Sequence, residues 1–429
     1  MSYPGCERSR IAPRFPYGIP GSRTQPTPYP DRMASPRAAI YRLSAARAIS
    51  VTGSQVAMVA LTYEVYQQTG SAVWVSAVFL ATFAAMGVLT PIGGWLGDTF
   101  DRRVIMIVSD LAAAAAFAAL AFADRPWLLI ALALVATVCE MPFMPASQAA
   151  IPNLAEPQDL AWANGLVSQA FSIGITIGPL IGGVLVGAFG GGPAFAINAV
   201  SFLASAALVW SVPGRFQERR HADEAVVDVP FTEGARVVLR TRILLWVVIA
   251  EVVAYLLVGW AMVADAPLAA LFGVGSIGFA SLISAWGIGM LIGSFLAGRH
   301  LGQRRIEIPI LLVGMLVDGL MIALMGVSPW FSLILGLSIV GGAAGGMVNV
   351  VRQTFFQRSV ADRIRSRVFA VVEVVASASF IIGLATAGPA IEAFGVRAAY
   401  VIAGIGFVLG ALVLLPVLRT RIPRAIDAA

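Results

Sequence analysis

Ionisable side chains interrupt several long apolar runs of this sequence. They are Arg47, Glu64, Asp110, Glu140, Glu251, Asp318 and Glu373. Charged groups at membrane depth are costly and rare, and those that occur mark ion pathways and ligand sites. Burial in lipid favours the neutral form of a carboxyl group, so an acid whose surroundings alternate between lipid and water can take up and release a proton. The pattern therefore predicts binding of protons or of cationic ligands.

The residue types that enzymes cluster at their active sites are sparse and scattered. Cys6 and Cys139 are far apart and lack the spacing of a zinc site. His221 and His300 lie in separate arginine-rich segments. All 29 basic residues are arginine, which excludes a Walker-type phosphate loop because that loop requires lysine. We therefore expect no metal, no cofactor and no enzymatic activity.

The composition indicates that the apolar runs lie in a membrane. Of the 429 residues, 59% are hydrophobic and 12% are charged, whereas soluble domains carry about 45–50% apolar and about 25% charged residues. A bilayer core about 30 Å thick requires about 20 apolar residues per helix. Twelve stretches meet this requirement and predict an all-α integral membrane protein: 41–66, 71–97, 104–123, 126–149, 161–189, 192–212, 243–264, 275–298, 308–326, 329–351, 367–393 and 396–418.

The arginines predict the orientation of the protein. With twelve spans both termini face the same side, and all but two of the 29 arginines, Arg125 and Arg397, then fall on that side. Because cytoplasmic loops carry the excess of positive charge, we expect both termini in the cytoplasm. The same rule explains the net charge of +6 without a nucleic-acid partner.

The expected organisation is a cytosolic tail, a six-helix bundle, a central cytosolic loop, a second six-helix bundle and a second tail. These parts are 1–37, 38–212, 213–242, 243–418 and 419–429. The first tail is rich in Pro, Ser and Arg and is expected to be disordered; the sequence leaves open whether Met1 or Met33 is the natural start. Within the central loop, FTEGARVVLRTR predicts a short amphipathic helix along the membrane surface.

The two halves of the sequence share a weak internal repeat. GVLTPIGGWLGDTFDRR (87–103) and GMLIGSFLAGRHLGQRR (289–305) start with Gly, end with an arginine pair and are six spans apart. GPLIGGVLVGAFG (178–190) is similarly paired with GPAIEAFG (388–395). Spans that are six apart have the same orientation, and parallel six-helix repeats with a substrate site between them form one architecture of secondary transporters.

Several of these segments resemble the major facilitator superfamily of transporters. The loop GGWLGDTFDRR is similar to the family's motif G-x-L-x-D-R-x-G-R-R at Gly94, Leu96, Asp98, Arg102 and Arg103. It departs from that motif at Thr99 and Asp101. RAISVTGSQVAMVALTYEVYQQTGSA, NLAEPQDLAWANG and QRSVADRIRSRVFA point to the same family, and the form D-x-F-D-R-R is similar to its macrolide and siderophore exporters. The resemblance covers 38–418 and implies two pseudo-symmetric six-helix bundles.

The resemblance gives the charged loop a role. In this family the carboxylate at the position of Asp98 faces the N-terminus of the eleventh helix, in the other half. A carboxylate there gains about 0.3–1 kcal/mol, so we expect Asp98, with Arg102 and Arg103, to latch the cytosolic ends of the halves together in the outward-open state. The alternative is a solvated turn that only sets the topology.

The resemblance also selects among the ionisable groups. The first, fourth, seventh and tenth helices line the central cavity of the family. Glu140 and Glu251 are therefore candidates for proton or substrate binding, together with Arg47 and Gln55. The alternative for each acid is a neutral or paired structural role. Glu373 lies near the arginines between spans ten and eleven and is expected to pair there.

Residues of the fifth span bear on the direction of transport. Gly174, Gly178, Pro179, Gly182 and Gly183 fit the pattern G-x-x-x-G-P-x-x-G-G, which is associated with exporters of the family. Small residues four apart also let helices pack closely, which is the structural alternative. We expect a bacterial inner-membrane transporter that exports a hydrophobic, drug-like or siderophore-like molecule in exchange for protons. An importer or a lipid transporter is the alternative, because a fold does not fix direction.

Overall fold

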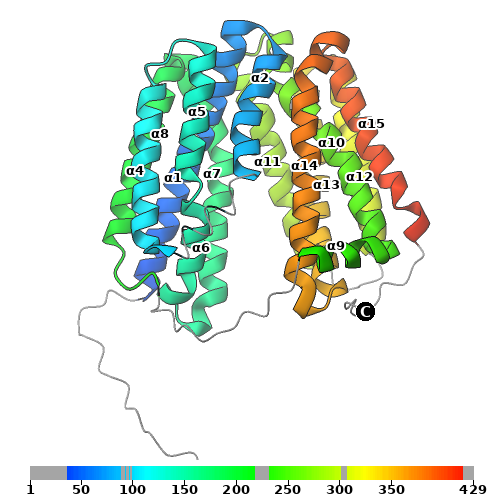
Figure 1. Ribbon diagram of the computed structural model, residues 1–429. Coiled ribbons are helices and arrows are strands. Elements are labelled where there is room, and N and C mark those ends of the chain that lie inside the picture. Colours follow the sequence, from blue (N-terminus) through cyan, green and yellow to red (C-terminus); the bar gives the residue numbers. More distant parts are fainter. Residues whose placement is uncertain are drawn as a thin grey trace, which may run out of the picture. The chain divides into compact units, whose positions relative to one another are not determined.

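The computed structural model describes residues 36–87, 99–217, 231–300 and 307–418, together with Ile92 and Leu96. The elements formed by these residues are helices (Figure 1). In lipid every backbone N–H and C=O group must be bonded within the protein, and a helix achieves this within one segment. Most of both expected tails, and 218–230 of the central loop, lie outside the described residues.

The first half of the protein folds into a group of long helices in which α1 packs on α7 and α8, and α4 packs on α5 and α8. Its elements are α1 (Pro36–Thr69), α2 (Ala72–Phe79), the π-helical turn η1 (Leu80–Ala84), α4 (Arg102–Leu120), α5 (Pro126–Glu140), α6 (Phe143–Leu154), the 3-10 turn η2 (Pro157–Asp159), α7 (Leu160–Phe189) and α8 (Gly191–Ser211).

The second half forms a similar group, in which α13 packs between α11 and α12, and α10 packs on α14 and α15. Its elements are α10 (Arg242–Leu271), α11 (Gly275–His300), α12 (Glu307–Val327), α13 (Phe331–Ser359), α14 (Asp362–Phe394), α15 (Val396–Val413) and the 3-10 turn η4 (Leu415–Val417). The short helix α9 (Phe231–Arg240) precedes it and confirms the helix predicted in the central loop.

The predicted spans correspond to observed helices. Within the described residues, ten helical segments are long and apolar enough to cross a membrane, and they coincide with the third to twelfth predicted spans. α1 has 34 residues but includes charged side chains such as Arg42, Arg47 and Glu64. The helix that begins at Ala72 continues to Gly87 as a shorter apolar segment. These two match the first two predictions, so the twelve-span all-α fold is confirmed.

The fourth predicted span differs from a single straight helix. α5 ends at Glu140 and α6 starts at Phe143. Pro142 between them has no N–H group, and its ring clashes with the carbonyl of the preceding turn, so it interrupts the helix. The break places Glu140 near the middle of the 29-residue span Pro126–Leu154.

Corresponding turns in the two halves have the same construction. Gly190 alone joins α7 to α8, and Gly395 alone joins α14 to α15. Both glycines have positive φ angles, 78° and 85°, in a region that glycine adopts without steric cost. Since these glycines end GPLIGGVLVGAFG and GPAIEAFG, the second sequence repeat has a counterpart in the structure.

Each half has its own apolar core, and a further cluster joins the halves. Phe117 and Phe202 stack at 5.6 Å inside the first half, and Phe355 is fully buried in the second. Ala72, Val75 and Phe79 of α2 are buried in a cluster whose other buried members come from α10, α11, α12, α13, α14 and α15. This cluster holds α2 against the second half.

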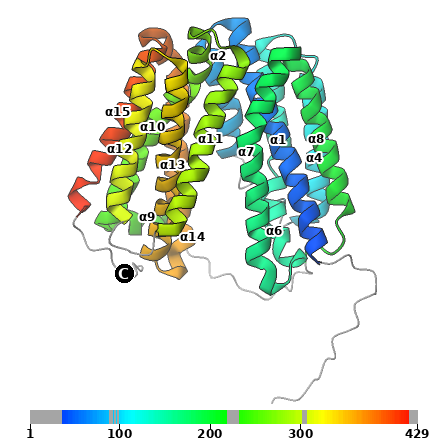
Figure 2. The same ribbon diagram turned by 180° about the vertical axis from the view of Figure 1, so that it is seen from behind.

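The halves also meet through hydrogen bonds at the end of the bundle opposite to α9. Ser276, at the start of α11, donates to the carbonyl of Gly183, near the end of α7, at 2.8 Å. Ser71, before α2, donates to the carboxylate of Glu392, near the end of α14. Figures 1 and 2 show the two groups of helices converging at this upper end and standing apart at the lower end, where α6 and α9 lie.

Candidate functional site

In the first half, an arginine and a carboxylate form a polar site between α1 and α5. The Oγ of Ser54 on α1 donates a hydrogen bond to Oε1 of Glu140 at 3.0 Å. Arg47 lies seven residues before Ser54, so both project from the same face of α1. The charges of Arg47 and Glu140 interact across the space between the helices. The site therefore contains one cation and one acid, both from spans predicted to line a cavity.

The Arg47 side chain is shielded from solvent by α7. Arg47 is 6% exposed, and its guanidinium carbon lies 5.2 Å from the ring centre of Phe171. A cation above an aromatic face recovers part of the hydration lost on burial. Gln55 is half-buried and packs against Gly178, where an added Cβ would lie 2.6 Å from the Cβ of Gln55. Gln55 thus contacts α7, whereas Arg47 lies within electrostatic range of Glu140.

In the second half, Arg352 on α13 lies between two carboxylates. Its Nη1 atom is 3.2 Å from Oε1 of Glu373 on α14 and 3.6 Å from Oε2 of Glu251 on α10. The Arg352 and Glu251 side chains are 11% and 10% exposed, whereas the Glu373 side chain is 56% exposed. The predicted pairing of Glu373 with a nearby arginine is confirmed. When fully ionised this cluster carries an excess negative charge, so it can accept a proton or a cation.

The two sites occupy corresponding helices with their charges exchanged. α1 and α10 are the first spans of their halves, and α5–α6 and α13 are the fourth spans. In the first half the arginine, Arg47, is on the first span and the carboxylate, Glu140, is on the fourth. In the second half the carboxylate, Glu251, is on the first span and the arginine, Arg352, is on the fourth. Equivalent helices of the repeat therefore present opposite charges.

Arg352 is a site residue that the sequence analysis assigned to a connection. The predicted tenth span ended at 351, whereas α13 continues to Ser359. The segment VRQTFFQRS contains neither Gly nor Pro, so a helix can continue through it. That absence of helix breakers was the available signal.

Asp265 was also missed, because α10 extends to Leu271 and not to the predicted 264. Its carboxylate accepts a hydrogen bond from the hydroxyl of Tyr400 on α15. Tyr400 is 1% exposed. A half-buried acid whose donor is a buried hydroxyl links α10 to α15.

Of the seven ionisable residues noted in the sequence, three lie outside the two arginine sites. Asp110 on α4 is buried beside Ser205 of α8. Asp318 on α12 is buried against α13, where a Cβ added to Gly341 would be 3.2 Å from Oδ1 of Asp318. Glu64, near the end of α1, accepts a hydrogen bond from Gln68 at an exposed position.

The expected latch loop is described in part. Gly94 and Asp98 lie outside the described residues, and Leu96 is half-buried. The contact of Asp98 with the other half therefore stays a prediction. Arg102 and Arg103 are described, and their hydrogen bonds identify what holds the start of α4.

Both arginines bind main-chain carbonyl groups of the first half. Nη1 of Arg102 donates to the carbonyl of Ala149 on α6 at 2.7 Å. Nη2 of Arg103 donates to the carbonyl of Trp210 on α8 at 2.6 Å. The start of α4 is thereby fixed to α6 and to the end of α8.

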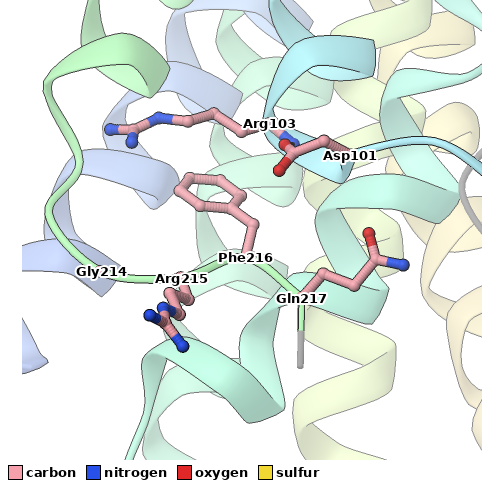
Figure 3. Close-up of a pocket in the computed structure, with 6 residues that line it drawn as sticks. All are labelled: Asp101, Arg103, Gly214, Arg215, Phe216 and Gln217. Atoms are coloured by element: carbon pink, nitrogen blue, oxygen red, sulfur yellow. The ribbon is translucent and has the colours of Figure 1, made fainter. Parts of the chain in front are cut away.

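A small pocket lies beside the start of α4 (Figure 3). Its volume is about 310 Å³, and its lining residues are Asp101, Arg103, Gly214, Arg215, Phe216 and Gln217. Oδ1 of Asp101 accepts hydrogen bonds from the N–H groups of Arg103 at 2.8 Å and Val104 at 3.2 Å, and so caps α4. The Arg103 guanidinium lies 5.2 Å from the ring centre of Phe216. These contacts hold the segment that follows α8 against the start of α4.

The glycines of the fifth span face two different helices. Added Cβ atoms at Gly174, Gly178 and Gly182 would lie 2.6 to 2.9 Å from atoms of α1. An added Cβ at Gly183 would lie 2.4 Å from the Cβ of Ala280 on α11, in the other half. Pro179 lies inside α7. α7 therefore packs closely on both halves, while bending at Pro179 stays a prediction.

Comparison with known sequences gives one consistent family. The chain matches the family model of the Major Facilitator Superfamily over residues 43–328 and 262–428. An uncharacterized MFS-type transporter, YfiS of Bacillus subtilis, is 26% identical over 380 residues, which are 84% of this chain and 89% of that protein. The multidrug efflux pump Tap of Mycobacterium tuberculosis is 27% identical over 391 residues, which are 86% of this chain and 92% of that protein.

Solved structures share the fold at low sequence identity. The nucleoside transporter NupG, in a mutant form, has a TM-score of 0.74 at 13% identity and covers 88% of this chain and 99% of its own. A bacterial homologue of the human lysosomal transporter Spinster, in an inward-facing and unoccupied conformation, has a TM-score of 0.69 at 15% identity. The match covers 92% of this chain and 99% of that protein.

Proposed function

Because this chain belongs to the major facilitator superfamily, we propose that it is a secondary active exporter that expels a hydrophobic small molecule in exchange for protons. The protein is a multi-pass membrane transporter and not an enzyme. One observation carries the finer proposal. Each half places an arginine and a carboxylate on its first and fourth spans, and Arg47, Glu251 and Arg352 among them are largely shielded from solvent.

The charge balance of the second-half cluster supports the proposal of proton exchange. Glu251 and Glu373 share Arg352, so one carboxylate is left without a compensating cation when both are ionised. The Glu373 side chain is exposed to water, whereas that of Glu251 is nearly buried. A proton taken up by this cluster neutralises the excess charge, and its release restores it.

The first-half site supplies the second part of the cycle. Glu140 lies at the break between α5 and α6 with a hydroxyl donor, Ser54, and a nearby cation, Arg47. Protonation of Glu140 removes the negative charge that interacts with Arg47, and an ionised Glu140 attracts a cationic ligand. Proton and substrate can therefore compete for this site.

The places where the halves touch support the proposal of alternating access. The contacts of α7 with α11 and of α2 with α14 close the end of the bundle opposite to α9, which we take as the outer end. Rocking of the bundles at 38–212 and 243–418 would open these contacts and bring the cytosolic ends together. We propose that Asp98 then latches the second half, with both termini in the cytoplasm of a bacterial cell and the bundles in its inner membrane.

The direction and the substrate class come from the relatives and from the fifth span. The Tap relatives are named multidrug efflux pumps, and Gly178 and Pro179 match the exporter pattern. We therefore propose a hydrophobic, drug-like or siderophore-like cargo and an outward direction.

A susceptibility panel tests this proposal. The gene is expressed in a bacterial host that lacks its own efflux pumps, and growth is measured with hydrophobic antibiotics, dyes and siderophores. An exporter raises tolerance to at least one compound, and Glu251→Gln at equal membrane abundance lowers that tolerance. Increased sensitivity would indicate an importer, and unchanged tolerance together with altered lipid distribution would indicate a lipid transporter.

A further inference from the structure

α9 lies across the second half near the starts of two membrane spans. It packs on α14 and α10, and it runs across them at the lower end of the bundle (Figure 1). α10 begins at Arg242, two residues after α9 ends, and α14 begins at Asp362. Because these are the polar ends of membrane helices, we expect a helix that packs on them to lie at the depth of the lipid headgroups.

The two faces of α9 differ sharply in exposure and charge. Gly234, Val237 and Val238 are buried against the bundle. Arg236 and Arg240 are four residues apart and therefore share one face of the helix. This face is opposite to the buried one, and both arginines are exposed. The packed face is apolar and the outer face is cationic.

An apolar side chain stands between the exposed arginines. Leu239 is 66% exposed, and Arg242 at the start of α10 adds a third exposed cation. The acid of α9, Glu233, is in its first turn and is half-buried. A helix with arginines around a projecting leucine suits the boundary between headgroups and acyl tails better than bulk water.

A glycine holds α9 tightly to the bundle. An added Cβ at Gly234 would lie 2.7 Å from both the carbonyl carbon and the carbonyl oxygen of Arg367 on α14. No larger residue fits there without moving α9 away from α14. α9 and the start of α14 are therefore in close backbone contact.

We propose that the outer face of α9, formed by Arg236, Leu239, Arg240 and Arg242, is a binding surface for anionic phospholipid headgroups of the cytosolic leaflet. The charge is complementary, and Leu239 reaches the boundary of the acyl tails. The positive-inside rule accounts for arginines on this side, but it does not account for an exposed leucine among them on a helix that is packed against two spans.

The proposed lipid-binding surface of α9 packs on α14, a helix that also carries a residue of the arginine site in the second half. α14 carries Glu373 one-third of the way along its length and contacts α2 of the other half near its far end, where Ser71 bonds Glu392. A lipid bound to α9 holds the opposite end of the same helix. Anionic lipid therefore stabilises α14 in the position seen here.

Lipid binding to the purified full-length protein tests the proposal. Phosphatidylglycerol or zwitterionic phosphatidylcholine is titrated into detergent-solubilised protein, and bound lipid is counted by native mass spectrometry. Each arginine near an anionic surface is worth about fivefold in the binding constant. The triple variant Arg236→Gln/Arg240→Gln/Arg242→Gln should therefore bind phosphatidylglycerol about a hundredfold more weakly at low salt, with phosphatidylcholine binding unchanged.

Two matched variants keep the test decisive. Arg125→Gln/Arg215→Gln removes two exposed arginines away from α9 and should bind phosphatidylglycerol like the wild type. The triple Arg→Lys variant keeps the charge of α9 and should also bind it; if the triple Gln variant fails to fold, single Gln variants replace it. The proposal is overturned if the triple Gln variant binds phosphatidylglycerol as the wild type does, or if the control pair weakens binding equally.

Discussion

Arg352→Met is expected to destabilise the protein more than removal of either acid that Arg352 binds. In this variant Glu251 keeps a side chain that is 10% exposed and loses the guanidinium 3.6 Å away. Breaking a buried ion pair from one side costs about 3–5 kcal/mol. Since neither partner is completely buried, we expect a loss of about 2–3 kcal/mol in the free energy of unfolding.

The two acids should respond differently from each other. Glu373 has a 56% exposed side chain, so its pair with Arg352 is worth under about 1 kcal/mol and Glu373→Gln should cost little. Glu251→Gln leaves Arg352 with Glu373 as its partner. In Arg352→Met/Glu251→Gln both buried charges are gone, and we expect about 2 kcal/mol less destabilisation than the sum of the single variants.

Unfolding in mixed micelles of dodecylmaltoside and sodium dodecyl sulfate, followed by tryptophan fluorescence, measures these differences. The wild type, the three single variants and the double variant are compared in the same micelle series. If Arg352→Met is within about 0.5 kcal/mol of the wild type, or if the single effects simply add, Arg352 does not neutralise a buried Glu251 and the reasoning is wrong.

Three further variants test separate parts of the structure. Gly183→Ala places a Cβ 2.4 Å from that of Ala280 and should weaken the contact between the halves by about 1–3 kcal/mol. The weaker contact should increase the labelling of cysteines placed at the outer end, whereas Gly165→Ala, with open space around it, should leave labelling unchanged. Tyr400→Phe removes the hydroxyl that donates to the half-buried Asp265 carboxylate and should lower stability by about 0.5–1.5 kcal/mol without altering the pH dependence of transport. A changed pH dependence would contradict a structural role. Asp101→Ala removes the cap of α4 and should cost about 0.5–2 kcal/mol, measured as faster amide exchange at 103–105, and equal exchange rates would show that the cap contributes nothing.

The architecture could be predicted from the sequence because membrane spans are specified by length and apolarity. Each span must satisfy its own backbone in lipid, so the twelve stretches map onto helices with few alternatives. The paired segments that end at Gly190 and Gly395 were predicted only as a repeat, and the equivalent turns at these glycines became visible in the structure. The pairing of Glu373 with an arginine followed from the nearby arginine-rich connection.

The helix ends and the side-chain partners were harder to predict. Arg352 and Asp265 were placed outside the spans because polar residues near the end of an apolar stretch resemble the start of a loop. In the structure α13 and α10 continue past them. A hydropathy pattern gives no information about which helices face one another, so the exchange of charges between α1–α5 and α10–α13 required the three-dimensional arrangement.

Substrate movement driven by a pH gradient tests the central claim most directly. Everted membrane vesicles containing the wild type, Glu140→Gln or Glu251→Gln are given an acidic interior, and accumulation of the compound to which the cells gained most tolerance is followed over time. We predict that the wild type accumulates the compound until a protonophore is added, and that both variants accumulate far less at equal protein abundance. Full gradient-driven accumulation by both variants would contradict proton exchange at these two sites.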